Sequence, residues 1–142
     1  MEIVWRKCAS YSEARDYSCV IYLHEWHGKP FYWGKAHKSF FGGHKRTRDG
    51  LTATGRYANG YRHWIEGCLR HGGHLYIGVL GDEEVAHIDE IERYLIAFYP
   101  SEMNRPESLS MPRLHLRHGG DIPRCLLSMN VKDCTILAGL QE

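Results

Sequence analysis

The stretch VIYLHEWHGKPFYWGKA, at residues 20–36, constrains the fold more strongly than any other part of the chain. Two runs rich in β-branched and aromatic residues flank EWHGK, whose glycine suits the positive φ of a short hairpin loop. The stretch therefore predicts a β-hairpin with Tyr22 and Tyr32 in the middle of its two arms. An odd-length turn at Gly28 would direct both phenols to one spot on a sheet face, although tyrosine is also an ordinary strand residue.

Beyond the hairpin, the chain carries loop, helix and strand signals in turn. Residues 35–57 are rich in Gly, Thr and basic side chains without a clear period, which predicts a long loop. Apolar residues recur at helical spacing over 58–69, and HLYIGVL at 74–80 is typical of a short buried strand. Residues 83–99 predict an amphipathic helix that Asp82 caps and Pro100 ends.

This order of elements favours one fold class. Strand, strand, helix, strand and helix predict an α/β domain with a small, mainly antiparallel three-stranded sheet, which includes the N-terminal hairpin and is flanked by helices. A length of 142 residues suits a single hydrophobic core. No run of about 18 apolar residues occurs, and charges interrupt the N-terminus, so we expect a soluble, cytoplasmic protein.

The net charge of +1 conceals an uneven distribution of charge along the chain. Nine Lys or Arg and only two acids lie between residues 29 and 75, whereas six acids and no Lys or Arg lie between 82 and 92. This asymmetry indicates a phosphate-binding surface beside a carboxylate site, with a solvated basic loop as the alternative. Candidate nucleic-acid contacts in and near the basic stretch are Lys38, His44, Lys45, Arg56, Tyr57, Arg62 and His63.

The number and spacing of the cysteines and histidines limit which disulfides and zinc sites the chain can form. Five cysteines, an odd number without a CxxC pair, argue against a disulfide framework and against a ribbon-type zinc site. HGGH at residues 71–74 lacks the i, i+4 spacing that brings two imidazoles of a helix onto one ion. A zinc hydrolase that uses His63, His71 and His74 stays open as an alternative.

The most informative residue of the last predicted helix is Glu92. At about 100° per residue, it falls about 40° from Ile88, inside the apolar stripe of the helix. A carboxylate directed at the core is costly unless it is paired, hydrogen-bonded or bound to a cation. Glu92 therefore needs a partner, either a basic side chain of the preceding loop or a divalent metal ion such as Mg²⁺, unless it lies at the edge of the stripe and still reaches water.

Taken in order, these motifs resemble those of the GIY-YIG nuclease superfamily. VIY at 20–22 and YWG at 32–34 correspond to its two triplets, with Val20 and Trp33 as departures, and YWGKA continues as in the compact excinuclease-like branch of the family. IERYLIAFYPSEMN places Glu92 twelve residues before Asn104, as in the same branch. The resemblance covers residues 18–105. Residues 1–17 would then be an extension with a possible edge strand, and residues 106–142 an extension packed on the same domain.

The resemblance implies a metal-dependent DNA endonuclease that hydrolyses phosphodiester bonds. By this resemblance Tyr22 takes a proton from the attacking water, and Lys35 or an arginine favours the phenolate electrostatically. Tyr32 would orient water or phosphate, and Glu92 would hold one Mg²⁺ or Mn²⁺ near the leaving oxygen. Asn104 would tie the end of the helix to the site. The expected products carry a 5′-phosphate and a 3′-hydroxyl.

The arginine of the family motif has several candidates in this chain. The spacing after the second triplet implies a short insertion around SFFGG, which leads to Arg46 or Arg48 as the group that neutralises phosphoryl charge, with Arg56 also open. Relatives often carry a His or Tyr after this arginine, for which the candidates are His44, Tyr57, Tyr61 and His63.

The resemblance also implies partners. We expect double-stranded DNA as the substrate and a homodimer or higher oligomer as one possible assembly. The expected setting is a bacterial or phage-infected cell, with a phage or mobile element as a possible origin. A nucleic-acid-binding module on the same scaffold without cleavage is the other alternative, and it predicts salt-sensitive binding without a metal-dependent product.

Overall fold

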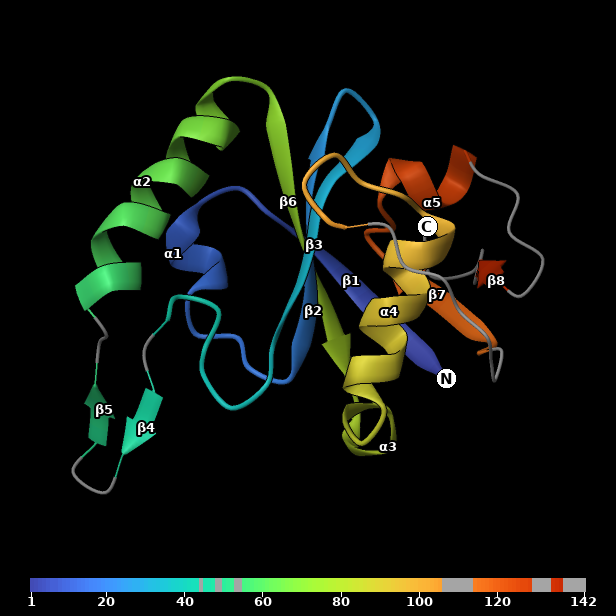
Figure 1. The fold of residues 1–142 in the computed structure, drawn as a ribbon, viewed down its shortest axis with the longest axis horizontal. Helices are drawn as coiled ribbons and strands as arrows, with labels where there is room; N and C mark the ends of the chain where they lie inside the picture. Colours follow the sequence, from blue (N-terminus) through green and yellow to red (C-terminus); the bar gives the residue numbers. More distant parts are fainter. Residues whose placement is uncertain (44, 48–49, 53–54, 106–113, 129–133, 137–142) are drawn as a thin grey trace.

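Helices cover both faces of a central β-sheet, which Figure 1 shows nearly edge-on. The computed structural model describes residues 1–43, 45–47, 50–52, 55–105, 114–128 and 134–136. Within these ranges the sheet has six strands in the order β3, β2, β6, β1, β7, β8, which span Lys29–Ala36, Val20–Trp26, Gly73–Leu80, Glu2–Cys8, Leu116–Gly120 and Cys134–Ile136. Helices α1 (Tyr11–Ala14) and α2 (Gly55–Arg70) lie on one side, and α3 (Asp82–Val85), α4 (Ile88–Phe98) and α5 (Arg124–Ser128) on the other.

The predicted α/β class is confirmed, but the predicted sheet of three strands is too small. The hairpin strands β2 and β3 pair antiparallel, and β6 adds to β2, also antiparallel. The sheet then continues through β1, which pairs antiparallel with β6 and parallel with β7. The segment expected as a possible edge strand is therefore an interior strand, and β3 forms one edge of the sheet.

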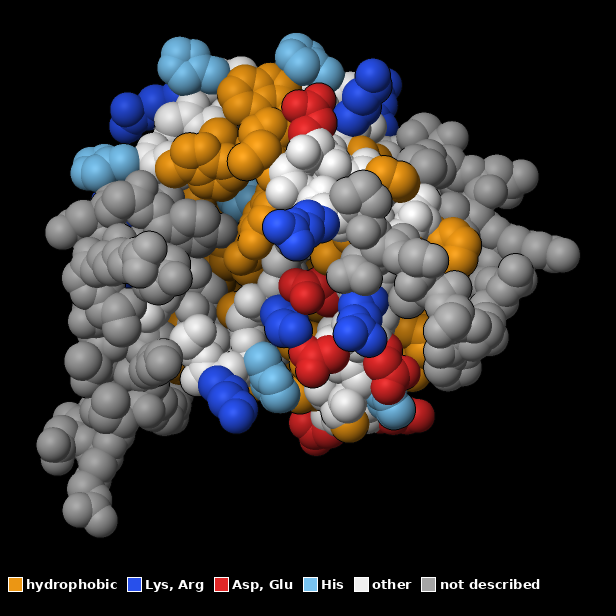
Figure 2. All heavy atoms as spheres, in the orientation of Figure 1, with side chains coloured by type: hydrophobic (Ala, Val, Ile, Leu, Met, Phe, Trp, Pro, Cys, Tyr) orange, Lys and Arg blue, Asp and Glu red, His pale blue; other side chains and the backbone are white. Residues whose placement is uncertain are grey.

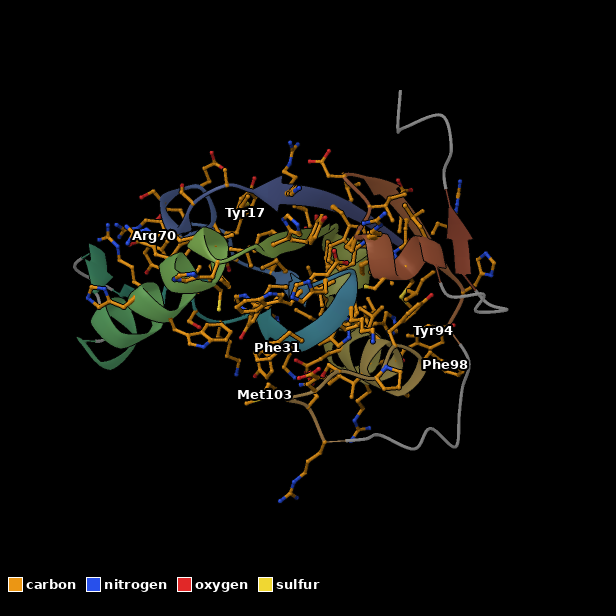
Figure 3. The ribbon with its side chains drawn as sticks, turned by 90° about the horizontal axis from the view of Figure 1, so that it is seen from above. Tyr17, Phe31, Arg70, Tyr94, Phe98 and Met103 are labelled. Carbon is orange, nitrogen blue, oxygen red and sulfur yellow. The ribbon has the colours of Figure 1, made fainter. Side chains whose placement is uncertain are left out.

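Two hydrophobic clusters pack on the two faces of the sheet because strand side chains alternate between the faces. Toward α4 and α5, the cluster contains Trp5, Leu23, Trp33, Ile91 and Tyr99, each at most 1% exposed. Toward α1 and α2, Val20, Phe41, Ile65, Leu75 and Ile77 form the second cluster. Figure 3 shows Tyr94 and Phe98 on α4 and Tyr17 and Arg70 on the side of α1 and α2.

Two local predictions differ from the structure. The single helix expected over residues 83–99 is divided into α3 and α4, because the backbone of His87 leaves the helical region with φ −115° and ψ 21°. Asp82 lies in the first turn of α3, and its predicted cap position belongs to Gly81. The predicted long loop contains a short antiparallel ribbon of β4 (Lys45–Thr47) and β5 (Gly50–Thr52). None of the described helices has the length and apolar character that a membrane crossing requires.

Candidate functional site

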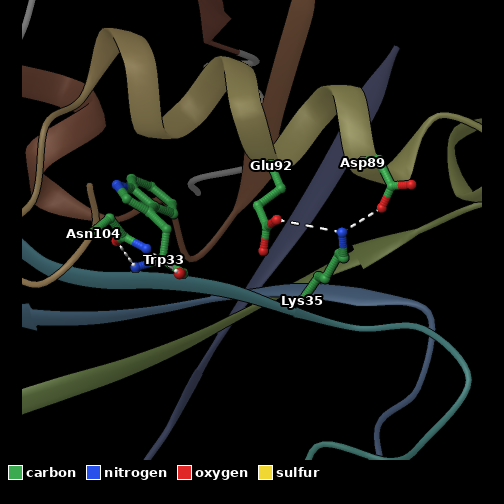
Figure 4. A network of polar contacts seen from close by, with 5 residues as sticks. All are labelled: Trp33, Lys35, Asp89, Glu92 and Asn104. Atoms are coloured by element: carbon green, nitrogen blue, oxygen red, sulfur yellow. Dashed lines mark hydrogen bonds and ion pairs between the residues drawn. The ribbon is translucent and has the colours of Figure 1, made fainter. Parts of the chain in front are cut away.

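An ammonium group and two carboxylates meet where α4 packs on the edge strand β3 (Figure 4). Lys35 Nζ lies 3.4 Å from Glu92 Oε1 and also contacts Asp89 Oδ1. The hydrogen bond to Asp89, with further attraction from both carboxylates, raises the pKa of Lys35, and the same hydrogen bond lowers the pKa of Asp89. Lys35 and Asp89 therefore stay charged at neutral pH. Asp89 was not singled out by sequence reasoning, although its i, i+3 spacing to Glu92 places both on one side of the helix.

Glu92 has the partner that its place in the apolar stripe requires. Its neighbours on the helix, Ile88, Ile91 and Leu95, are buried, while its own side chain keeps 20% exposure. Lys35 is 34% exposed and Asp89 74%, so the cluster opens to solvent along the sheet edge. The predicted alternative of an ion pair with a basic residue is realised in this structure.

Tyr22 and Tyr32 share one face of the sheet, but they are not direct cross-strand partners. Tyr22 pairs with Gly34 and Tyr32 pairs with His24, so the two phenols are diagonal neighbours with ring centroids 6.1 Å apart. They lie on the α2 side, whereas Lys35, one position from Gly34, extends toward α4 on the other side. The sheet edge thus separates the phenols from the carboxylates.

Gly34 allows the Tyr22 ring to reach this edge. A Cβ at Gly34 would lie 2.3 Å from Tyr22 Cζ and 2.4 Å from its phenol oxygen. The end of the ring, with its hydroxyl, therefore lies directly over Gly34 of the outermost strand. The glycine of the YWG triplet is required by this close approach. The phenol oxygen of Tyr22, which belongs to β2, consequently lies over the residue of the edge strand that precedes Lys35.

Aromatic side chains hold Tyr22 in place. The Phe41 ring packs edge-on against Tyr22 with centroids 4.9 Å apart, and the His24 ring lies 5.8 Å away. His24 is 4% exposed, and its burial lowers its pKa to about 3, so the imidazole is neutral at physiological pH. Sequence reasoning missed His24, although its position two residues after Tyr22 on the same strand predicts that the two share a face.

Asn104 ties the segment after α4 to the edge strand. The Trp33 backbone N–H donates to Asn104 Oδ1 at 2.8 Å, and Asn104 Nδ2 donates to the Trp33 carbonyl at 2.9 Å (Figure 4). Next to it, the Met103 N–H donates to the Phe31 carbonyl at 3.0 Å. These bonds pair outward backbone groups of β3 on both sides of Tyr32, and they fix the strand that carries Tyr32, Gly34 and Lys35.

The predicted arginines and basic contacts are placed only in part. Arg48 and His44 lie outside the described residues, and of Arg46, Lys45, Arg56, Tyr57 and Tyr61 only the backbone is described, in β4 and α2. The choice among the arginines stays a prediction. Arg62 is paired with Glu66 at 3.0 Å and lies over the Tyr11 ring, whereas Lys38 and His63 are exposed.

The donor set at the edge suits a hard divalent cation. In the part of the chain that the structure describes, no three His, Cys, Asp or Glu side chains are grouped to hold one metal ion, and this includes His63, His71 and His74. Mg²⁺ is commonly held by one or two carboxylates with water and substrate phosphate oxygens. Glu92 and Asp89 supply two carboxylates that already surround one positive charge.

Comparisons with family models, curated proteins and solved structures found no match for this chain.

Proposed function

We propose that the protein is a metal-dependent DNA endonuclease of the GIY-YIG type. One observation carries this proposal: the Tyr22 phenol lies over Gly34 at the sheet edge, and the next residue, Lys35, reaches the carboxylates of Glu92 and Asp89 on the other face. The antiparallel order β3, β2, β6 and the Asn104 contact with β3 support it. A proton acceptor, a cation and a pair of carboxylates at one edge suit hydrolysis of a phosphodiester.

Each residue has a role that its surroundings permit. Tyr22 accepts a proton from the attacking water, and Lys35 or one of the candidate arginines favours the phenolate that must form first. Tyr32 orients the water or a phosphate oxygen. Glu92 would hold the metal ion with help from Asp89, and a bound Mg²⁺ or Mn²⁺ would supply charge stabilisation at the phosphate and the leaving oxygen. Arg46 or Arg48 would neutralise the remaining phosphoryl charge.

Lys35 also lies between the two parts of the site, the phenol of Tyr22 and the carboxylates of Glu92 and Asp89. Its ammonium is held by both carboxylates in this structure, where it offsets part of their negative charge. Because the Lys35 side chain is partly exposed, the ammonium would be able to turn toward a substrate phosphate. Lys35 thus keeps the two carboxylates in place before substrate binds.

The test is cleavage of supercoiled plasmid by wild type and by Tyr22→Phe, Lys35→Met and Glu92→Gln, with Mg²⁺, Mn²⁺ or EDTA. We expect metal-dependent nicking or linearisation by wild type and its loss in all three variants. Glu90→Gln is the matched control, because Glu90 is an exposed carboxylate on the same helix. Circular dichroism checks that each variant is folded.

A second candidate function is a nucleic-acid-binding module without cleavage, and the complete pairing of Lys35 with two carboxylates favours it. The two functions predict different results in the same assay. Wild-type protein that binds DNA in a salt-sensitive manner but gives no product with any divalent metal would exclude the nuclease and leave the binding module.

A further inference from the structure

A group of partly exposed aromatic rings lies beside the phenols and has no role in the proposed hydrolysis. Trp64 of α2 is 39% exposed, and its ring lies 6.1 Å from that of Phe31 at an angle of 28° between planes. Phe31 in turn lies 6.1 Å from Trp26. We call Trp26, Phe31 and Trp64 the aromatic platform. Figure 2 shows hydrophobic side chains gathered between α2 and the end of the hairpin, and Figure 3 shows Phe31 on its strand near Met103.

The aromatic platform is the exposed end of a continuous series of rings that leads to the phenols. The Trp64 ring packs edge-on against His24 with centroids 4.6 Å apart, and His24 lies 5.8 Å from Tyr22 and 6.4 Å from Tyr32. His24 is buried and neutral, so it forms a firm base for Trp64. The platform therefore has a fixed position relative to Tyr22 and Tyr32.

The charges around the aromatic platform suit a polyanion with planar rings. Lys29 lies two residues before Phe31, His63 directly precedes Trp64, and Arg105 follows Asn104 at the strand edge; all three side chains are exposed. Figure 2 shows Lys, Arg and His side chains around the hydrophobic group on this face, together with an acidic side chain beside it. A protein partner would fill apolar surface as well, but cations interspersed with exposed aromatic rings are the pattern that binds single-stranded nucleic acid.

We propose that the aromatic platform binds an unpaired nucleobase of the substrate strand close to the cleaved phosphodiester. A base stacked on Trp64 lies nearly parallel to Phe31 as well, because the two ring planes differ by only 28°. Inside a duplex the base faces are stacked on each other and only the edges are accessible, so an internal base pair offers the rings no face to stack on. The preferred substrate is therefore DNA with a single-stranded extension, a bubble or a branch beside a duplex. This inference rests on the proposed function, since it uses the phenols as the cleavage point.

The test measures binding in EDTA, where no cleavage occurs. Two fluorescein-labelled DNAs are compared, a blunt duplex and the same duplex with a single-stranded extension. We expect Trp64→Ala to weaken binding of the extended DNA by roughly ten-fold or more and to leave the blunt duplex unchanged, because stacking on an aromatic ring supplies this much per base. Trp64→Phe should retain most of the affinity. Leu127→Ala is the control, as Leu127 is also an exposed apolar side chain but belongs to α5.

A second measurement covers the case in which Trp64→Ala does not fold. 2-Aminopurine is placed in the extension, and its fluorescence should fall when wild-type protein binds, since stacking quenches it. Equal binding of both DNAs by wild type, equal losses on both DNAs, or an unquenched 2-aminopurine would overturn the proposal and assign the aromatic platform to a protein partner. If binding behaves as expected but no metal yields a product, the nuclease proposal fails and the platform stands.

Discussion

Replacing Gly34 by alanine tests whether the position of the Tyr22 ring determines activity. The new methyl group would lie 2.3 Å from Tyr22 Cζ, where ordinary contacts begin at 3.4 Å, so the ring must move by about 1 Å or more. Phe41 and His24 pack against the same ring, which leaves it little room to turn. The phenol oxygen then leaves the sheet edge, although every proposed reacting group is still present.

The expected magnitudes follow from this displacement. A misplacement of about 1 Å lowers the rate of cleavage roughly 100-fold. Overpacking lowers the free energy of unfolding by about 1–3 kcal/mol, so the protein stays folded but less stable. Gly67→Ala on α2 is the matched control, since a Cβ there meets nothing within 4 Å. It should leave cleavage unchanged and raise the free energy of unfolding by about 0.5–1 kcal/mol.

The assay combines single-turnover plasmid cleavage with urea unfolding for Gly34→Ala, Tyr22→Ala and the double variant. If the methyl group acts only by displacing the ring, Gly34→Ala should have little further effect on stability once Tyr22 is alanine. Full cleavage by Gly34→Ala would refute the assigned position of the phenol. A stability loss that persists in the Tyr22→Ala background would show that Gly34 is needed for another reason, such as its backbone conformation.

Three further predictions use other contacts of the same region and core. Asn104→Ala removes two hydrogen bonds with the Trp33 backbone and should lower the free energy of unfolding in urea by about 1–3 kcal/mol; an unchanged midpoint would mean that Asn104 does not hold the strand. Lys35→Met should reduce cleavage at least about 100-fold while barely moving the urea midpoint, because its ion pairs are exposed to solvent; a large stability loss would point to a structural role. Burial lowers the pKa of His118 from 6.5 to about 4, so the unfolded chain binds a proton first and stability is lost as the pH falls from about 6.5 toward 4. His118 alone should lower the free energy of unfolding by about 2 kcal/mol between pH 7 and pH 5, and His118→Gln should flatten the dependence measured by urea unfolding at the two pH values. An equally steep dependence in His118→Gln would assign it to other groups such as His24.

Local patterns in the sequence predicted the hairpin and the unusual place of Glu92. The turn residues around Gly28 and the β-rich arms were sufficient to predict the hairpin. Helical periodicity was sufficient to predict that Glu92 lies in the apolar stripe. The register was not predictable in the same way. His27 and Gly28 both have positive φ, 54° and 75°, and a bulge between His24 and Glu25 precedes this turn, so Tyr22 faces Gly34 and not Tyr32. The role of that glycine becomes visible only once the register is known.

Local patterns in the sequence did not predict which distant segments pair as strands. EIVWRKC alternates buried and exposed positions only in part, which is also typical of an edge strand, whereas its partners β6 and β7 decide that it is interior. Asp89 and His24 became site residues through contacts with Lys35 and Trp64 that spacing alone does not show. The basic stretch lacks a period, so no pattern selected one arginine within it.

The interior place of β1 sets an order for folding during synthesis. Its antiparallel neighbour β6 and its parallel neighbour β7 both follow far along the chain, with Trp5 opposite Gly78 in one and Gly120 in the other. The strand that leaves the ribosome early therefore completes its pairing only after the hairpin, both long helices and β7 have been made. High contact order of this kind slows folding, and until β7 arrives one side of β1 is open to strands of other nascent chains.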